Sequence, residues 1–300
     1  MNILLEHDYV VAKVDKLVSD ILTPEITISN QKIADQKIAD QLNSYYQPMT
    51  LQYDNELVYA NSIKWFLGSC YLVCGNRYSN EVIWDETMAQ IFLNALRLYK
   101  NELATAKTDF AFQENRNGQS LFEYMKFFLH EYKRLLIVRV DLKIKSEFAH
   151  KVSIDSFNDF MNDLRDDIGR KRGCFKHLRG HAWAIEQGVD TGGLHCHLLL
   201  LYNGDKRWKD WYLAEAVGKR WVKITEGMGC YFNCNDTGQK RAYERQGTLG
   251  IGMIHRNNAL EVNNAINAAL YLTRADKYDQ RLKASLPNMR SFGRGTYSKD

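Results

Sequence analysis

The sequence predicts an α+β protein, with an antiparallel β-sheet on which helices pack and a mainly helical N-terminal region before it. Three patterns predict this class. Residues 85–107 carry apolar side chains at three- and four-residue spacing, as in an amphipathic helix. Residues 135–142 are a β-rich run, and residues 181–187 and 194–202 flank a glycine-rich loop, as in a β-hairpin. Strict β-α-β repetition is missing, which favours an antiparallel sheet over a parallel one.

The N-terminal part is expected to be mostly helical to about residue 110. Within it, residues 31–40 are a perfect tandem of Gln-Lys-Ile-Ala-Asp, which indicates a short polar helix or linker rather than a solenoid. Residues 114–120 are polar and contain a glycine, which is typical of a loop. We therefore expect a helical N-terminal region of unassigned role at residues 1–118 and a second domain at residues 119–300.

The second domain is expected to alternate strands and helices. After the strand at 135–142, a helix is expected over residues 153–172, with Ser153 as a plausible N-cap. The hairpin comes next. Beyond it we expect a helix at 208–223, short strands at 229–234 and 248–255, and a helix at 261–280. The predicted order is β-α-β-β-α-β-β-α.

Length and composition exclude several classes of protein. The 300 residues are 45% hydrophobic and 25% charged, with 3 prolines, as in ordinary folded proteins and unlike disordered or collagen-like chains. The longest apolar runs have strand length, whereas a membrane span needs about 20 apolar residues. The N-terminus has no basic region ahead of an apolar stretch, so it does not resemble a secretory signal. We therefore expect no membrane partner and a cytoplasmic location.

The six cysteines are expected to be free thiols, because a chain of this length needs no disulfide to fold. Cys70 with Cys74 and Cys230 with Cys234 form two C-x3-C pairs, which could be read as a four-thiolate zinc site. The spacing is loose and the pairs are far apart in the chain. Free thiols are therefore the preferred interpretation.

Charge is unevenly distributed along the chain. Residues 1–130 hold 11 Lys and Arg against 16 Asp and Glu, so the remaining residues carry the positive excess. This excess points weakly to an anionic partner such as nucleic acid. Residues 206–209, Lys-Arg-Trp-Lys, together with Trp211 and Tyr212, place cations beside rings that could stack on bases. The same stretch is equally typical of a solvated helix start.

Two histidines in the hairpin are candidate metal ligands. His195 and His197 are two residues apart on a predicted strand, so both project from one face. If residues 188–193 form the loop, Glu186 lies opposite His195 and shares that face, whereas a one-residue slip would present Gln187. Two imidazoles and one carboxylate suit Mg²⁺ or Mn²⁺ in a catalytic role, and also Zn²⁺. Ordinary core histidines are the alternative interpretation.

The last predicted helix carries a candidate nucleophile. Its polar stripe consists of Asn264, Asn267, Tyr271, Arg274 and Tyr278. A tyrosine with Arg274 one turn on and Lys277 nearby suits attack on a phosphate, because the cations would stabilise phenolate and phosphate oxygens. A surface-packed tyrosine is the alternative, since the chain has 17 tyrosines. Asp141 is a weaker site candidate that could instead pair with Arg139 or Lys143.

These residues resemble the motifs of the HUH nucleases. His195-Cys196-His197 and Tyr271-Leu272-Thr273-Arg274 match, in order, the His-hydrophobic-His and Tyr-x-x-Lys motifs of that superfamily. The run at 139–142, the hairpin and the tail at 290–295 are similar to replication proteins of the filamentous-phage (inovirus) type found in bacterial prophages. The resemblance covers about residues 130–296. Arg274 stands where lysine is usual, so either Arg274 or Lys277 fills the lysine role.

The resemblance implies that residues 119–300 are an HUH-type nuclease domain with an RRM- or palm-like sheet. It implies a rolling-circle replication initiator that nicks and rejoins single-stranded or hairpin origin DNA through a 5′-phosphotyrosine, using Mg²⁺ or Mn²⁺ and no organic cofactor. Tyr271 is favoured as the nucleophile, with Tyr278 as a second nucleophile or a neighbour. A host helicase and DNA polymerase are further candidate partners. The alternatives are a non-catalytic DNA-binding regulator of a phage or mobile element, and a transposase-type HUH relative or other metal-dependent hydrolase.

Overall fold

The computed structural model describes residues 6–23 and 31–297. They form two compact units. The first takes in the described residues up to 110 together with 187–193 and 278–289, and the second takes in 111–186, 194–277 and 290–297. The expected domain boundary after residue 118 lies within the second unit. In the described part of the chain, no helix is both long enough and apolar enough to cross a membrane.

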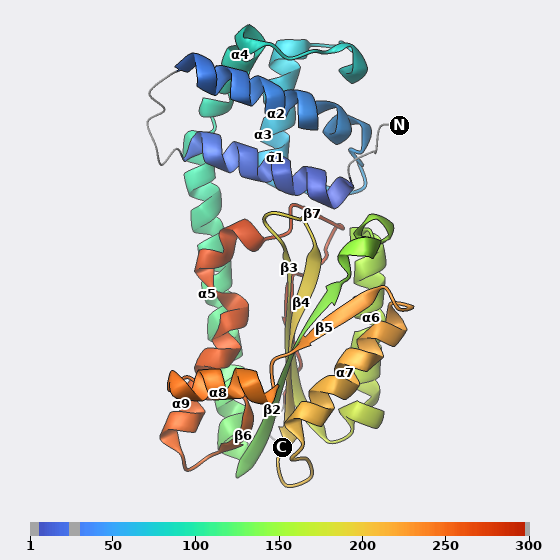
Figure 1. The fold of residues 1–300 in the computed structure, drawn as a ribbon. Coiled ribbons are helices and arrows are strands. Elements are labelled where there is room, and N and C mark those ends of the chain that lie inside the picture. Colours follow the sequence, from blue (N-terminus) through green and yellow to red (C-terminus); the bar gives the residue numbers. More distant parts are fainter. Residues whose placement is uncertain (1–5, 24–30, 298–300) are drawn as a thin grey trace. The chain divides into compact units, whose positions relative to one another are not determined.

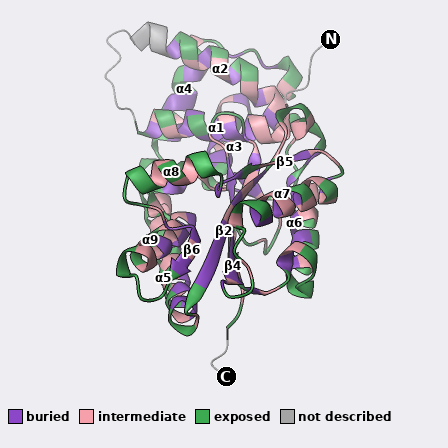
Figure 2. Cartoon of the chain, turned by 60° about the horizontal axis from the view of Figure 1, so that its bottom comes forward, coloured by how far each residue is buried: buried purple, intermediate pink, exposed green. Residues whose placement is uncertain are grey.

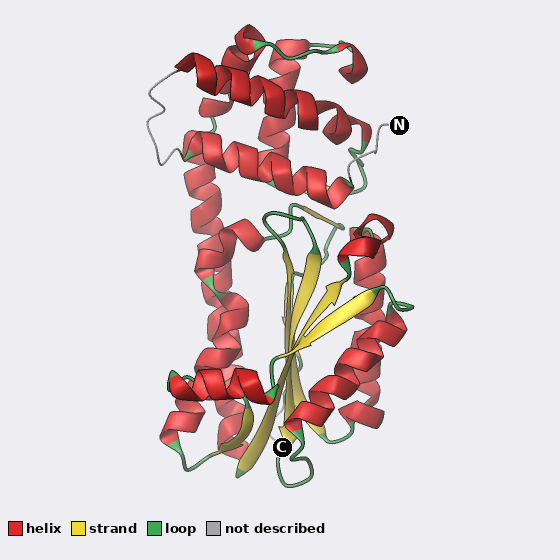
Figure 3. Cartoon of the chain, in the orientation of Figure 1, coloured by secondary structure: helices red, strands yellow, loops and turns green. Residues whose placement is uncertain are grey.

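The first unit is built mainly from helices (Figure 3). Its elements are α1 (His7–Leu22), α2 (Gln31–Leu51), α3 (Asn61–Cys74), α4 (Glu86–Arg97) and the first part of α5 (Lys100–Glu131), with β1 (Val58–Tyr59) paired antiparallel to β7 (Ala284–Ser285). Apolar side chains at helical spacing, among them Val10, Val14, Leu42, Phe66 and Phe92, form its core. The prediction of a mainly helical N-terminal region is confirmed, and the tandem repeat lies within α2.

Two details of the predicted helices were wrong. The helix expected at 85–107 is interrupted, because α4 ends at Arg97 and α5 begins at Lys100. The loop expected at 114–120 is instead the interior of α5. Polar side chains there bond along the helix, as when Gln113 Nε2 donates to Asn117 Oδ1 at 3.0 Å. The polar composition therefore belongs to a continuous helix whose side chains here range from buried to exposed, and does not mark a break in the chain.

A buried lysine in the first unit gives its stability a pH dependence. Lys283 is 1% exposed, and its Nζ donates to the carbonyl oxygens of Asp279 at 2.6 Å and Gln187 at 3.2 Å. Burial lowers the pKa of Lys283 from 10.5 to about 8, an effect that Arg281 reinforces and that Asp15 and Asp279 oppose. Between these two pKa values the unfolded chain holds a proton that the folded chain does not, so this group makes folding more favourable as pH rises.

We expect the free energy of unfolding of the wild type, relative to Lys283→Met, to rise by about 2 kcal/mol between pH 7.5 and 9.5. Urea denaturation of both proteins at the two pH values measures the difference. Subtracting the variant removes the titration of every other group. A difference that stays constant with pH would contradict the lowered pKa.

The second unit contains a six-stranded antiparallel sheet. Its strands are β2 (Arg134–Ile144), β3 (Leu178–Gln187), β4 (Leu194–Asn203), β5 (Gly229–Asn233), β6 (Gly252–His255) and β8 (Phe292–Arg294). The strand order is β5-β2-β4-β3-β8, and β6 pairs with the other end of β2. In Figure 2, β2 is buried over most of its length, as expected for a central strand.

Helices cover both faces of this sheet (Figure 1). On one face lie α6 (Ile154–Arg170) and α7 (Asp210–Ile224), and on the other lie the second part of α5, α8 (Thr237–Arg245) and α9 (Ala259–Leu270). Ser153 Oγ accepts a hydrogen bond from the Ser156 amide at 3.3 Å, which confirms the predicted N-cap of α6. Helix α8 was not predicted. The fold class, an antiparallel sheet with packed helices after a mainly helical region, is confirmed.

Candidate metal centre

The sheet face toward α5 and α9 changes from apolar to polar along its strands. Residues 135 and 137 of β2 and 199 and 201 of β4 are apolar and belong to one core with residues of α5 and α9. Alternate residues of a strand share a face, so the same face next carries Arg139 and Asp141 on β2 and His197 and His195 on β4. Asp141 pairs with His197 and residue 143 with His195. The site is therefore built where the apolar core on this face ends.

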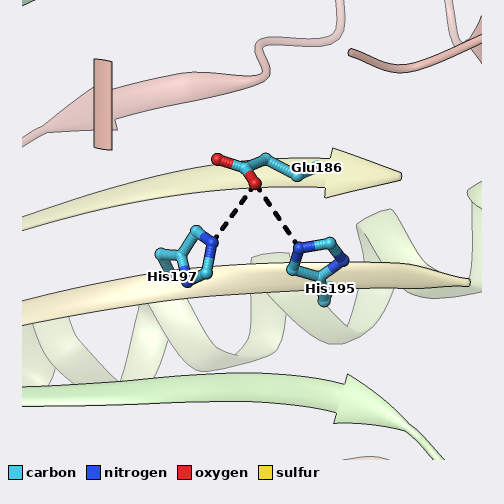
Figure 4. Close-up of side chains that lie close together, drawn as sticks. All are labelled: Glu186, His195 and His197. Atoms are coloured by element: carbon cyan, nitrogen blue, oxygen red, sulfur yellow. Dashed lines mark hydrogen bonds and ion pairs between the residues drawn. The ribbon is translucent and has the colours of Figure 1, made fainter. Parts of the chain in front are cut away.

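Glu186, His195 and His197 come together on β3 and β4 (Figure 4). Each offers one ligand atom, and these atoms lie within 4.8 Å of one another. Glu186 Oε2 is 3.2 Å from His197 Nε2 and 3.5 Å from His195 Nε2. Two imidazole nitrogens and a buried carboxylate are a donor set that suits a divalent cation, so this group could hold a metal ion. The structure thus brings together the three residues that the sequence predicts as metal ligands.

Gln187, the alternative that a register slip would have presented, is used elsewhere. Its side chain is 1% exposed, and its Oε1 accepts a hydrogen bond from the Lys283 amide at 2.8 Å. The turn supports the expected register, because the Gly188 amide donates to the Gly193 carbonyl at 3.0 Å. Glu186 is thus the carboxylate of the group.

Asp141 orients His197 from the other side of the imidazole ring. Its Oδ1 lies 2.7 Å from His197 Nδ1 and 3.3 Å from Arg139 Nε. Bonding at Nδ1 leaves Nε2 directed at Glu186, which is the arrangement that fixes a metal-ligating histidine. From the sequence, Asp141 was a weaker site candidate that could instead pair with Arg139 or Lys143; in the structure it bonds both Arg139 and His197.

Burial and hydrogen bonding act in opposite directions on the ionisation of these groups. Burial disfavours the charged carboxylates, but hydrogen bonds from the histidines and Lys277 outweigh it and hold the pKa of Glu186 well below its ordinary value. The pKa of Asp141 is lowered in the same way, against burial, by His197 and Arg139. The pKa of His197 is raised, against burial, by Asp141 and Glu186. Both carboxylates of the centre are therefore held in their ionised form.

Asp141→Asn is expected to weaken Mn²⁺ binding by about 10- to 100-fold, as for other groups that orient a ligand. An asparagine amide can donate to Nδ1 and so place the ring proton on Nε2, where it blocks coordination. Isothermal titration with Mn²⁺ measures the affinity. Asp205→Asn, which removes a carboxylate from an exposed pair with Arg134, is the matched control. Equal affinities for Asp141→Asn and the wild type would contradict this role.

Tyr271 follows directly on α9 and lies beside the metal group. Its ring meets the His197 ring edge to face, with 5.6 Å between centroids. Arg139 Cζ lies 4.5 Å from its centroid and Lys277 Nζ lies 3.7 Å from it. The helix expected at 261–280 was wrong beyond residue 270, because Arg274 is extended between the 3-10 helices Tyr271–Thr273 and Ala275–Gln280. The predicted polar stripe is therefore not the face of one helix, because Asn264 and Asn267 lie on α9 whereas the other three residues come after it.

The two basic candidates for the lysine role have different surroundings. Lys277 is 8% exposed, and its Nζ donates to Glu186 Oε1 at 2.6 Å, so it touches both the metal group and Tyr271. Arg274 is exposed, and it pairs with Asp276, Nε donating to Oδ1 at 2.8 Å, while its Cζ is 5.8 Å from the Tyr271 centroid. Lys277 is therefore the basic residue with direct contact to the site.

Tyr278 is the one predicted site residue that belongs to the first unit. It is 9% exposed and packs in that unit's core, edge to face with Phe110 at 5.5 Å between centroids. Arg281 Cζ lies 3.9 Å from its ring centroid, and burial raises the pKa of Tyr278. Its surroundings are those of a core tyrosine, in contrast to Tyr271.

Sequence reasoning missed the contribution of Arg139, which it named only as a partner for Asp141. The signal was present, since residues 139 and 141 alternate on one strand and share the face of His197. The cysteines behave as expected: all six are free. Over residues 6–23 and 31–297, the only cluster of at least three potential metal-binding side chains is Glu186 with the two histidines, so no four-thiolate site is found.

The model of the YagK/YfjJ C-terminal domain family matches residues 100–295, which is more than half of the chain. The chain belongs to this family. Neither the curated proteins nor the solved structures gave a match. The YagK/YfjJ domain of this chain contains the six-stranded sheet, the metal group and Tyr271. The family name states no activity, so the function has to be argued from the site.

Proposed function

We propose that this YagK/YfjJ-family protein is a metal-dependent, site-specific single-strand DNA endonuclease and strand transferase that initiates rolling-circle replication. The observation that carries the proposal is the contact between Tyr271 and His197, which places a cation-surrounded phenol against a group that could hold a metal. A nucleophile, a potential Lewis-acid site and charge-stabilising groups are then neighbours in one unit. That is the combination that covalent attack on a phosphodiester requires.

Glu186, His195 and His197 would hold Mg²⁺ or Mn²⁺, which when bound would supply positive charge to the scissile phosphate. The fit rests on the donor set, because one carboxylate and two imidazoles leave coordination positions free for phosphate oxygens. Asp141 keeps Nε2 of His197 directed at the centre. The proposal therefore needs no organic cofactor.

Tyr271 acts as the nucleophile in this proposal. Its Oη attacks phosphorus, a Tyr–O–P bond forms, and the bond from phosphorus to the 3′ oxygen breaks. The products are a 5′-phosphotyrosine and a free 3′ hydroxyl. The phenol loses one proton and the 3′ oxygen gains one, so the step consumes no ATP and no redox agent. Reversal by a 3′ hydroxyl rejoins a strand, since the phosphodiester energy is kept in the covalent bond.

Arg139 and Lys277 would stabilise the charge that develops in this step. Both cations already lie close to the Tyr271 ring, at 4.5 and 3.7 Å from its centroid. Buried or half-buried cations stabilise phenolate and phosphate oxygens more strongly than exposed ones, because water screens them less. Lys277 also neutralises Glu186 through Oε1. We therefore assign charge stabilisation to Arg139 and Lys277 in preference to the exposed Arg274.

The partners follow from the same chemistry. The substrate is origin DNA in single-stranded or hairpin form, and the free 3′ hydroxyl would prime a DNA polymerase, with a helicase opening the duplex ahead of it in the cytoplasm of a bacterial host. Trp208, Trp211 and Tyr212 are 67%, 47% and 61% exposed around the start of α7, as rings that stack on DNA would be. These rings and the adjacent basic residues are candidates for DNA contact.

The proposal is tested by incubating the purified protein with labelled single-stranded DNA from its own replicon's origin and Mn²⁺. We expect a protein–DNA adduct that resists denaturation and that EDTA abolishes. A double-stranded copy of the same DNA serves as the control substrate. DNA binding without any adduct would overturn the nuclease proposal and favour a non-catalytic DNA-binding regulator, while strand exchange confined to element ends would favour a transposase-type relative.

A further inference from the structure

Two rows of side chains cross the sheet from the metal group to the edge strand β5. Asp141 of β2 pairs with His197 on one side and with Phe232 of β5 on the other. Lys143 pairs in the same way with His195 and Cys230. Directly paired residues project from the same face of a sheet. Phe232 and Lys143 therefore lie on the face that carries the metal group.

Both side chains are open to solvent. Phe232 is 44% exposed, and Lys143 is also exposed. Because this exposed ring lies on the sheet face of the candidate catalytic centre, it is accessible to a ligand bound there. Adjacent strands are about 4.8 Å apart, which puts the Phe232 backbone roughly 10 Å from that of His197. At about 3.4 Å per stacked nucleotide, that separation spans only a few nucleotides.

Packing does not account for the phenylalanine. Strand β5 is attached to α7 through its opposite face, where Tyr231 Oη donates to Glu215 Oε2 at 2.8 Å and Asn233 Nδ2 donates to Glu215 Oε1 at 3.0 Å. Its backbone is paired with β2 from residue 229 to 233. The strand is held in place without the Phe232 ring, so that ring is available for another partner.

We propose that Phe232 and Lys143 form a subsite for single-stranded DNA next to the scissile phosphate. A base stacks on the Phe232 ring, and a neighbouring phosphate meets the Lys143 ammonium. Stacking tolerates any base, because every base presents a π-face. The inference rests on the proposed function and adds to it a path for the strand, across β2 to the β5 edge of the sheet.

The first test uses fluorescence anisotropy of a labelled 20-nucleotide oligo(dT) with metal-free protein, so that binding is measured without cleavage. Phe232→Ala and Phe232→Leu are expected to weaken binding roughly 10- to 100-fold, whereas Phe232→Trp keeps the wild-type affinity. Phe112→Ala removes another ring of the same unit, 64% exposed on α5, and is the matched control that leaves affinity unchanged. Wild-type affinity in Phe232→Ala, or in Phe232→Leu, would overturn the stacking role.

The second test is the salt dependence of the same binding. Loss of one phosphate contact should reduce the slope of log K against log salt by about 0.7 in Lys143→Ala. Lys64→Ala, at an exposed position on α3, should leave the slope unchanged. An unchanged slope in Lys143→Ala would overturn the phosphate contact. Both tests are independent of adduct formation. If the Phe232 and Lys143 variants bind DNA as expected for a lost contact but the wild type forms no adduct, only the nuclease proposal is refuted. If the wild type forms the adduct but these variants bind DNA as the wild type does, only the subsite is refuted.

Discussion

Tyr271→Phe is expected to reduce the rate of adduct formation by at least about 1,000-fold, the scale on which enzymes lose activity when their nucleophile is removed. The variant keeps the ring that meets His197 and Lys277, so the packing and the cation contacts are preserved. Only the attacking oxygen is lost. The rate is measured with labelled origin DNA and Mn²⁺, and DNA affinity is measured in parallel.

Tyr278→Phe is the matched control for this experiment, because it also removes one hydroxyl but from a ring in the core of the first unit. We expect its rate of adduct formation to stay at the wild-type level. If instead Tyr278→Phe abolished the adduct and Tyr271→Phe retained it, the nucleophile would be Tyr278. The contacts of the Tyr271 ring would then contribute to packing and not to catalysis.

His197→Ala is expected to weaken Mn²⁺ binding by more than about 100-fold, a larger effect than that of a residue that only orients a ligand. His197 contributes Nε2 to the group, and its Nδ1 is bonded to Asp141. Adduct formation should fall with metal occupancy. Isothermal titration gives the affinity, and the adduct assay gives the activity.

Removing His197 also takes one hydrogen-bond partner from each of Asp141 and Glu186, which costs stability. His195→Ala, at a more exposed ligand with 16% side-chain exposure, therefore tests the same metal dependence with less disturbance. His255→Ala removes a surface histidine that is also paired with a glutamate, at 2.9 Å from Glu261, and should leave Mn²⁺ binding unchanged. Wild-type Mn²⁺ affinity in both His197→Ala and His195→Ala would show that these side chains do not hold the metal.

The strand part of the site could be predicted because strands have a fixed two-residue period. Once the loop at 188–193 is recognised, the positions of Glu186, His195 and His197 on one face follow from backbone geometry alone. The same period relates Arg139 to Asp141. These relations depend on local sequence, so they hold without knowledge of the rest of the fold.

The region after Tyr271 could not be predicted in the same way. Its helical periodicity continues past residue 270, but the chain leaves the helix, and Lys277 forms an ion pair with Glu186 far away in the sequence. Such a tertiary contact overrides local propensity and gives no local signal. Residues 114–120 were wrongly predicted as a loop because polar composition alone does not distinguish a loop from a helix.

The most direct test of the central claim is to digest the denatured adduct with a protease and locate the attached nucleotide by tandem mass spectrometry. The proposed mechanism predicts a phosphodiester link to Oη of Tyr271, with the DNA joined through its 5′ phosphate. A link to another residue would assign the nucleophile elsewhere. A link through a 3′ phosphate would contradict the proposed polarity of cleavage, and with it the release of a 3′ hydroxyl that primes synthesis.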